Sequence, residues 1–345
     1  MADAGPIVAG RISVVVVNYN CADVIERPLR SLGVQSWADV EVIVVDNDSQ
    51  DSSMEIVAER FPDVRRIALG VNVGFAEANN RGVEASSGDL VMLLNPDAWL
   101  EPTGLEHLAR ALYDDERIGV VGGTVRHEDG TIQEIGNLVD RAGFPVPRRE
   151  GAQTPIDRGA FFVGGCAMMM RRRDWDRCGG FDGRFFMFFE EVDLCWRLQR
   201  TGFDVAIVPD VTIWHLGGFT LSGGYAKGGT HRTNPQRVYL RERNTLASVI
   251  KNGDTGTIGW AMAGWAMNAV EAVGFAVLGQ RDVARQYPRA LAWNARHLRE
   301  SLRMRRATRA SFVRRDRDLP GWARGSGKLR VLRSSGVPVV EGREA

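Results

Sequence analysis

The chain has 345 residues, of which 44% are hydrophobic and 25% are charged, with 39 Gly and 13 Pro. This composition is ordinary for a folded protein and excludes a disordered or fibrous chain. The four cysteines are scattered and form no C-x-x-C pair, which argues against a disulfide framework or a cysteine zinc site and favours the reducing cytoplasm. The first eleven residues lack the charged and apolar segments of a secretory signal, so we expect none.

The net charge of +1 conceals two regions of opposite sign. Residues 281–333 hold 16 Lys and Arg against 4 Asp and Glu, a net charge of +12. Residues 1–280 hold 27 Lys and Arg against 37 Asp and Glu, a net charge of −10. The basic segment predicts contact with anions, and a solvated, salt-bridged helix surface is the alternative. No helix-turn-helix or RNA-binding signature accompanies it, so we expect no nucleic-acid partner.

The first hundred residues alternate β-branched runs with helical spacing. We expect strands over 12–17, 40–45, 64–69 and 90–94, separated by helices over 24–32, 54–61 and 75–86. Runs this apolar suit parallel strands that are covered on both faces. The order predicts a doubly wound, mostly parallel α/β fold, with the ligand site beyond the carboxyl ends of the strands.

The middle of the chain has weaker patterns. Residues 126–158 are rich in Gly, Pro and charge and are expected to form a long excursion or flexible loop. A helix is expected over 192–201, followed by two short strands over 205–208 and 211–214.

Beyond Pro235 the strand signals stop and helical patterns continue to about Arg317. We therefore expect a body over 1–235 and a helical, basic region over 236–345. Residues 257–279 are long and apolar enough to span a membrane, but Glu271 opposes insertion, so a buried or interfacial helix is favoured. Because the basic segment follows, this helix suggests a membrane-surface element, and a plain packed helical domain is the alternative.

Polar residues follow three of the expected strands, at Asn18-Tyr19-Asn20, Asp46-Asn-Asp-Ser49 and Asn95-Pro96-Asp97. Asp46 can accept hydrogen bonds from a nucleotide base or ribose. Asp97 can bind Mg²⁺ or Mn²⁺ together with phosphate oxygens and water. Asp at a strand end is also a common turn residue or helix N-cap, and that alternative stays open for either residue alone.

A second cluster lies farther along the chain. The aromatic-rich run 185–189 leads directly into Glu190 and Glu191. A carboxylate beside apolar surface and another acid has a raised pKa, which suits a general base, although acids also stabilise the first turn of a helix. His215 follows an expected strand and is a candidate metal ligand or phosphate contact, or an ordinary structural histidine.

The motifs form an ordered set over residues 10 to 220 that resembles a known family. The first four are Ile12 to Asn20, Asp46-Asn-Asp-Ser-Gln-Asp-Ser52, Asn72-x-Gly74-Phe-Ala-x-x-Asn79-Asn80-x-Gly82 and Gly88-Asp89-x-x-Met-Leu-Leu-Asn-Pro-Asp97. They are followed by Gly164-Gly-Cys166, Gly179-Gly-Phe-Asp182, Phe189-Glu-Glu-Val-Asp-Leu-Cys195 and His215-x-x-Gly218. The series resembles the inverting family 2 glycosyltransferases with a GT-A fold, especially their rhamnosyltransferase-like branch.

The resemblance implies a role for each matching residue. The nucleotide sugar would contact Val17, Tyr19, Asp46, Asn47, Asn79, Asn80, Asn95 and Asp97. Glu191 stands at the catalytic base, and Asp97 and His215 stand at the metal site. The acceptor side would be formed by Gly164, Gly165 and Cys166, with Glu190 and Asp193 in support.

The chain departs from the family pattern at three of these positions and at Ala98. Asn95 replaces the first Asp of the family's D-x-D motif, and Ala98 replaces a frequent third acid, so metal binding depends more heavily on Asp97. Glu191 replaces the more usual Asp, and Asn79 replaces a frequent Arg or Lys.

The resemblance implies an Mg²⁺- or Mn²⁺-dependent inverting glycosyltransferase of cell-wall or surface polysaccharide synthesis. L-rhamnose from dTDP-rhamnose is the favoured donor sugar, and a UDP-linked hexose or galactofuranose is the alternative. The acceptor would be a saccharide or a polyprenyl-linked saccharide at the inner face of the plasma membrane, reached by peripheral contact through the basic region. A homo-oligomer and a non-catalytic module that binds nucleotide sugar or lipid also remain open. A sugar nucleotidyltransferase is disfavoured because Asn18-Tyr19-Asn20 is not a G-x-G-T-R loop.

Overall fold

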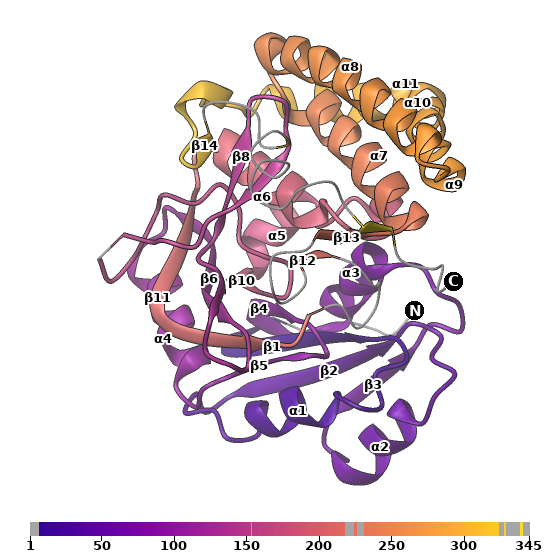
Figure 1. The fold of residues 1–345 in the computed structure, drawn as a ribbon. Coiled ribbons are helices and arrows are strands. Elements are labelled where there is room, and N and C mark those ends of the chain that lie inside the picture. Colours follow the sequence, from indigo (N-terminus) through magenta and orange to yellow (C-terminus); the bar gives the residue numbers. More distant parts are fainter. Residues whose placement is uncertain are drawn as a thin grey trace.

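The computed structural model describes residues 7–152, 154–217, 224–225, 231–323, 328 and 339–340. A central sheet carries helices on both faces, and the helices of the C-terminal region gather at one end of the molecule (Figure 1). The expected α/β fold with a helical C-terminal extension is confirmed.

The main sheet has nine strands within the described residues. In sheet order they are β3 (Arg65–Ala68), β2 (Val40–Asp46), β1 (Val8–Asn18), β4 (Gly88–Leu94), β10 (Ala167–Arg171), β6 (Ile118–Arg126), β11 (Asp204–His215) and β5 (Ala98–Leu100), with β7 (Ile132–Glu134) beside β6. Strands β1 to β4 pair in parallel, as do β6 and β11, whereas β10, β5 and β7 run antiparallel to their neighbours.

The sheet separates two hydrophobic cores, and the helices divide between them. One face carries α1 (Glu26–Leu32), α2 (Ser53–Arg60) and α4 (Gly104–Asp114), and the other carries α3 (Phe75–Ala85), α5 (Arg172–Cys178) and α6 (Glu190–Arg200). In β1, Val14 and Val16 pack on the first face, while Val15 and Val17 pack on the second. This alternation follows from the two-residue period of a strand and explains why the run is apolar throughout.

The parallel register brings the polar strand ends to one edge. Asn18 at the end of β1 pairs directly with Asp46 at the end of β2. On the other side of β1, Val16 pairs with Leu94, the last residue of β4, so Asn95 follows at the same edge. The ligand site expected beyond the carboxyl ends of the strands therefore has its polar residues in place.

The expectation of a long loop over 126–158 is wrong. This segment contains β7, β8 (Asn137–Asp140) and β9 (Pro145–Pro147), and β8 pairs with β14 (Trp322–Ala323) from the far end of the chain. Strands of three or four residues are too short to show a periodic pattern, and part of their pairing comes from a segment about 180 residues away.

Strand β11 also corrects the sequence reading. It is one strand, where two had been expected, and its pairing with β6 shifts register between Val208 and Thr212. Helix α6 begins at Glu190, two residues before the expected helix, because Phe189 in a left-handed conformation serves as its N-cap.

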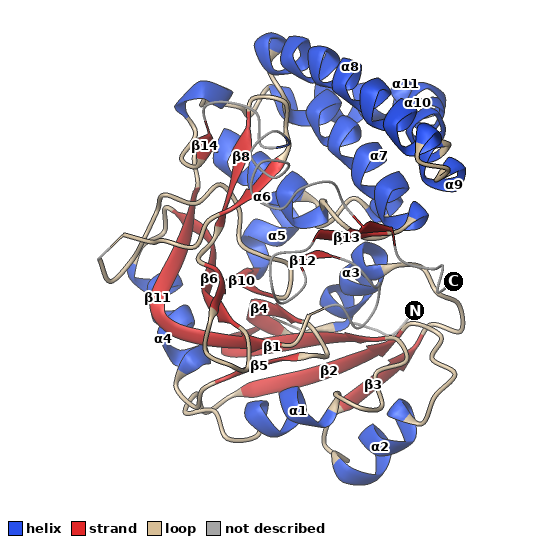
Figure 2. Ribbon diagram, in the orientation of Figure 1, coloured by secondary structure: helices blue, strands red, loops and turns tan. Residues whose placement is uncertain are grey.

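The C-terminal region is helical as expected (Figure 2). Its helices are α7 (Pro235–Asn252), α8 (Thr255–Val277), α9 (Arg281–Ala284), α10 (Gln286–Arg296) and α11 (Leu298–Arg309), and the short 3₁₀ helices of the chain are η1 (Gly183–Phe185) and η2 (Asp316–Asp318). The region was expected to contain no strands, but its described part contributes two. Strand β14 pairs with β8 of the body. Strand β15 (Val339–Val340) pairs with β13 (His231–Thr233), which also pairs with β12 (Gly224–Tyr225). Among the described residues, no helix combines the length and apolarity that crossing a membrane requires.

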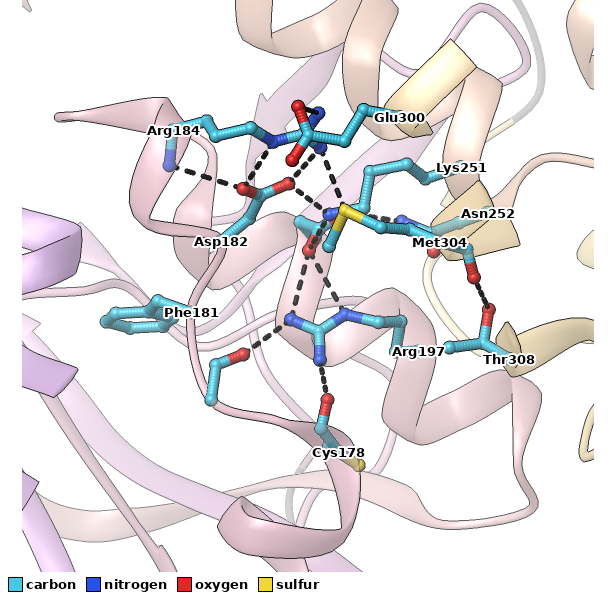
Figure 3. A network of polar contacts seen from close by, with 12 residues as sticks. Cys178, Phe181, Asp182, Arg184, Arg197, Lys251, Asn252, Glu300, Met304 and Thr308 are labelled. Carbon is cyan, nitrogen blue, oxygen red and sulfur yellow. Dashed lines mark hydrogen bonds and ion pairs between the residues drawn. The ribbon is translucent and has the colours of Figure 1, made fainter. Parts of the chain in front are cut away.

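A buried ionic network fastens this region to the body (Figure 3). Lys251 of α7 is 2% exposed, and its Nζ lies 2.7 Å from Asp182 and 2.9 Å from Asp193. Arg184 also binds Asp182 and reaches Glu300 of α11 at 3.1 Å. Burial alone raises the pKa of Asp182, but Arg184 and Lys251 hold it below its usual value.

Candidate active site

The ends of β1 and β2 form one polar cluster. Asn18 Nδ2 donates to Asp46 Oδ1 at 3.3 Å and to the hydroxyls of Ser49 and Ser53 at 3.0 and 2.7 Å. The backbone N–H of Ser49 also donates to Asp46 Oδ1, at 3.3 Å. Asp46 is held in place at the sheet edge, where a nucleoside would approach.

The remaining residues predicted for the nucleotide lie around this cluster. Val17 is buried in the core, and Tyr19 follows β1 and is half-buried. Asn47 binds the loop that leads into α3, since its Nδ2 donates to Asn72 Oδ1 at 3.0 Å and its Oδ1 accepts from the Val73 N–H at 2.9 Å.

Asn79 and Asn80 both lie on α3, and their side chains bind the protein backbone, with one further contact from Asn80 Nδ2 to Glu77 Oε2 at 3.3 Å. Asn79 Nδ2 donates to the Phe75 carbonyl at 2.9 Å. Asn80 exchanges two 3.0 Å hydrogen bonds with the backbone of Phe181, which fastens α3 to the loop before η1. Their predicted proximity to the nucleotide remains a prediction.

Asp97 and His215 meet although they are far apart in the chain. Asp97 Oδ1 lies 3.3 Å from His215 Nε2, and Asp97 Oδ2 accepts from the Gly217 N–H at 3.0 Å. The other ring nitrogen, Nδ1, faces Oε1 of Gln133 at 3.1 Å. Because an amide oxygen only accepts, this contact places a proton on Nδ1. In the neutral ring Nε2 is then an acceptor, and it and the Asp97 carboxylate would together suit a cation.

The described residues contain no cluster of three or more His, Cys, Asp or Glu that could hold a metal. Within the described residues Asp97 and His215 would supply two ligands, which suits an ion that takes its other ligands from phosphate oxygens and water. Asn95 lies beside them, with Nδ2 3.5 Å from His215 Nε2. Gly218, the last residue of the His215 motif, lies outside the described residues.

The segment 164–166 connects the Asp97–His215 pair to the acids of α6. The Asn95 N–H donates to the Cys166 carbonyl at 2.8 Å. On the other side, a Cβ on Gly165 would lie 3.8 Å from the Glu191 carboxyl carbon and 3.9 Å from Glu190 Oε1. Burial raises the pKa of the Cys166 thiol, and the charges of Glu134, Asp97 and Glu191 raise it further. Acids from three separate parts of the chain therefore surround one thiol.

Glu190 and Glu191 differ in their environment. Glu190 is 4% exposed, and burial followed by the charge of Glu191 raises its pKa well above the ordinary value. Glu191 is half-buried, and burial raises its pKa to about 7, with backbone N–H groups lowering it and Glu134 raising it. The Oε2 atoms of both glutamates are buried and find no hydrogen-bond partner among the described residues.

Glu134 and Gln133 are parts of this site that the sequence reading missed. Glu134 Oε2 accepts from Asn137 Nδ2 at 2.8 Å, and burial raises the pKa of its carboxyl. A Cβ on Gly164 would lie 2.0 Å from Glu134 Oε1, so a larger residue at this position would displace the Glu134 carboxylate. Both missed residues lie on the three-residue strand β7, in the segment expected to be a loop, and no spacing rule marks them.

Asp193, unlike the other predicted acceptor-side residues, binds residues of the C-terminal helix α7. It is fully buried, its Oδ2 binds Arg197 and Lys251, and its Oδ1 accepts from Asn252 at 2.8 Å. These contacts join α6 to α7, and the predicted support of the acceptor remains a prediction.

Comparison with known proteins agrees with this geometry. Residues 13–179 match the family described as "Glycosyl transferase family 2". The chain is 28% identical over 231 residues to the N-acetylglucosaminyl-diphospho-decaprenol L-rhamnosyltransferase of Mycobacterium tuberculosis, covering 59% of this chain and 75% of that protein. It is 24% identical over 205 residues to the low-salt glycan biosynthesis hexosyltransferase Agl10 of Haloferax volcanii, covering 56% and 63%.

Two solved structures share the fold. The mannosyltransferase PcManGT of Pyrobaculum calidifontis, in complex with GDP-Man and Mn²⁺, has a TM-score of 0.51 and 20% identity, over 85% of this chain and 90% of that one. GalNAc-T7 with UDP, GalNAc and Mn²⁺ has a TM-score of 0.54 and 15% identity, over 70% of this chain and 48% of that one, so this chain matches about half of its length. The fold is GT-A, residues 13–179 form a family 2 glycosyl transferase domain, and the chain is a glycosyltransferase.

Proposed function

We propose that this glycosyltransferase is metal-dependent and inverting, and that it moves L-rhamnose from dTDP-rhamnose to a saccharide or lipid-linked saccharide. One observation carries the proposal: the Asp97–His215 pair and the Glu191 carboxyl converge on segment 164–166. The similarity to an L-rhamnosyltransferase supports the choice of sugar.

Glu191 is the catalytic base of this proposal. Its carboxylate accepts the proton of an acceptor hydroxyl while the hydroxyl oxygen bonds to the anomeric carbon. The bond from that carbon to the diphosphate breaks in the same step, so the configuration inverts. A pKa of about 7 suits the task, because the base is then ionised for part of the time at neutral pH and still accepts a proton readily.

Asp97 and His215 would hold the divalent cation, Mg²⁺ or Mn²⁺. When bound, the cation neutralises the charge that develops on the leaving diphosphate. Gln133 fixes the His215 ring in the orientation that presents Nε2, and the Gly217 N–H fixes the Asp97 carboxylate. Asp46 and its neighbours would hold the nucleoside, with the predicted contacts from Val17, Tyr19 and Asn47 nearby.

A donor screen tests this assignment directly. We expect purified protein with Mn²⁺ to consume dTDP-rhamnose in preference to UDP-galactofuranose or UDP-hexoses when a lipid-linked acceptor is supplied. Preference for a UDP-sugar would support the alternative donor. Binding without consumption of any donor, with or without acceptor, would support the non-catalytic module and contradict the proposal.

The acceptor and the membrane contact form the second part of the proposal. The M. tuberculosis relative is named for a decaprenol-linked acceptor, and a similar acceptor here would lie at a membrane surface. We assign the region 236–345 to this contact and the body 1–235 to catalysis. Helix α8 offers the apolar surface: its most exposed large side chains and the one that follows it are Trp260, Met262, Val270, Val273, Val277 and Leu278, each at least 54% exposed.

The polar side chains Asn268 and Glu271 of α8 bind neighbouring helices. Glu271 accepts from the Tyr287 hydroxyl at 2.9 Å, and Asn268 donates to Glu242 at 2.6 Å. No fully exposed residue of α8 is charged. Exposed arginines follow on α9 to α11, and their charge complements an anionic lipid surface.

Flotation with vesicles tests the membrane contact. Full-length protein should float with vesicles that contain phosphatidylglycerol, and Val273→Glu with Val277→Glu should remove most of the floated fraction. Val34→Glu on the body is the matched control, because Val34 is 62% exposed, like Val273 at 63%. Unchanged flotation of the double variant, or its conversion of a dimer to a monomer instead, would overturn the contact.

A further inference from the structure

The segment that leads into the catalytic base has an unusual backbone. Phe186, Phe188 and Phe189 have φ values of 64°, 69° and 74°, a region that non-glycine residues rarely occupy. Phe186, with ψ −62°, is the centre of a strained γ-turn, closed by a 2.7 Å hydrogen bond from the Met187 N–H to the Phe185 carbonyl. Such strain persists only where the surroundings impose it.

Helix α7 supplies much of that constraint. The side chain of Asn244 is fully buried, and its Nδ2 donates to the carbonyls of Phe185, Met187 and Phe188 at 3.0, 2.9 and 2.7 Å. From the opposite side, the Ala76 N–H of α3 donates to the Phe186 carbonyl at 3.1 Å. Each carbonyl from 185 to 188 therefore has a donor: the two N–H bonds of the Asn244 amide are shared among three of them, Arg243 also donates to Phe185, and Ala76 donates to Phe186.

The orientation of the Asn244 amide is itself fixed. Its Oδ1 accepts from Arg243 Nε at 2.7 Å, which leaves Nδ2 turned toward the strained segment. Arg243 also donates to the carbonyls of Arg184 and Phe185. Its guanidinium stacks on Trp293 of α10, with 4.6 Å to the ring centroid.

The strained segment determines where Glu191 points. Phe189 is the N-cap of α6, and Glu191 is the second residue of that helix. If residues 186–189 relaxed to ordinary φ values, the start of α6 would turn and the Glu191 carboxyl would leave segment 164–166.

We propose that Asn244 is a positioning residue for the catalytic base, so that the C-terminal region serves catalysis by holding the strained turn 186–189. This inference rests on the proposed role of Glu191. It gives α7 a function that does not depend on membrane contact.

The test compares Asn244→Ala with Asn294→Ala. Both variants remove a buried side-chain amide, but Asn294 is not hydrogen-bonded to the segment 185–188. Asn294 on α10 is 3% exposed, and its Nδ2 donates to the carbonyls of Ala290 on α10 and Arg243 on α7, but to none of the carbonyls 185–188. For Asn244→Ala we expect kcat to fall about 100-fold, the loss typical of a catalytic group displaced by about 1 Å, with the pH dependence of kcat altered. The Kd for dTDP with Mn²⁺, measured by calorimetry, should stay within about twofold, because the nucleotide site lies on other elements.

Asn294→Ala should keep kcat within about threefold, even if its melting temperature falls as much as that of Asn244→Ala. All assays are run well below each variant's melting temperature. Asn244→Asp, which keeps the volume but loses the N–H donors, replaces Asn244→Ala if the latter does not fold. A kcat near that of the unmodified protein in either Asn244 variant, or an equal loss in Asn294→Ala, would overturn the inference.

The Glu191→Gln variant distinguishes a failure of the positioning role of Asn244 from a failure of the proposed base. If Glu191→Gln is inactive while Asn244→Ala is active, only the positioning role is wrong. If Glu191→Gln is active, the proposed base is wrong and the inference fails with it.

Discussion

His215 Nε2 lies 3.3 Å from Asp97 Oδ1, because Asp97 directly precedes Ala98 of β5, which pairs with His215 of β11. Gln133 Oε1 faces Nδ1, so in the neutral ring Nε2 and the Asp97 carboxylate would both be acceptors for a cation. The Asn95–Cys166 hydrogen bond then brings segment 164–166, and with it Glu191, to the same place. The predictions below test the parts of this arrangement one at a time.

Loss of the base should stop turnover without loss of donor binding. Glu191→Gln should lower kcat by about 10²–10⁴-fold, the usual contribution of a positioned general base. Glu190→Gln is the matched control, because burial and the charge of Glu191 raise the pKa of the Glu190 carboxyl and Gln resembles its protonated form. We expect its kcat to stay within about threefold in steady-state assays. Equal losses in both variants would mean that the two glutamates do not have separate roles.

The rate should depend on pH through the Glu191 carboxyl. Since its pKa is raised to about 7 and the base acts when ionised, kcat/KM should rise as the pH increases through 7 and be lost below it. Glu134→Gln removes a negative charge that raises this pKa, so the rise should move to lower pH. A profile that stays flat from pH 5 to 8 would argue against a glutamate base.

Metal-dependent donor binding should depend on the Asp97–His215 pair. Asp97→Asn and His215→Ala should each weaken dTDP binding in Mn²⁺ at least about tenfold, and Gln133→Ala should do so to a smaller extent. Calorimetry with and without Mn²⁺ measures the effect. Asp89→Asn, at the other end of β4, is the control that should change nothing. Equal weakening of binding in the absence of metal would indicate a direct contact with the nucleotide.

The buried network at Lys251 should matter for stability. Lys251→Met leaves Asp182 and Asp193 without their shared cation, and breaking a buried pair costs about 3–5 kcal/mol of unfolding free energy. Arg285→Met, which breaks an exposed pair with Asp282, should cost less than about 1 kcal/mol in the same urea titration.

The same network predicts how stability varies with pH. Because the pKa of Asp182 is lowered in the folded protein, its stabilisation is present above the unfolded value of about 3.9 and is lost as the pH falls further. Urea titrations at pH 3 to 6 should show this loss in the unmodified protein and a smaller one in Lys251→Met. An identical acid dependence in the two proteins would show that Lys251 does not control this carboxyl.

The sequence alone predicted those strands and helices whose residue pattern lies within one short segment of the chain. The strands that include Val14 to Val17 are apolar on both faces because helices cover both faces, and their polar ends identified Asp46 and Asp97. Glu134 could not be identified, because it lies on a three-residue strand whose position depends on pairing with β6. The role of Asn244 could not be predicted either. Its partners are backbone carbonyls 56 to 59 residues away, and any residue type could supply them.

The central claim is that one sugar ring lies between the Asp97–His215 pair and Glu191. A crystal structure of the Glu191→Gln variant with dTDP-rhamnose and Mn²⁺ tests it most directly, because the anomalous scattering of manganese locates the ion without ambiguity. We predict a manganese peak within coordination distance of Asp97 and His215 Nε2, with the anomeric carbon between it and the side chain at position 191. A manganese peak elsewhere, or a sugar on the far side of segment 164–166 from position 191, would contradict the account.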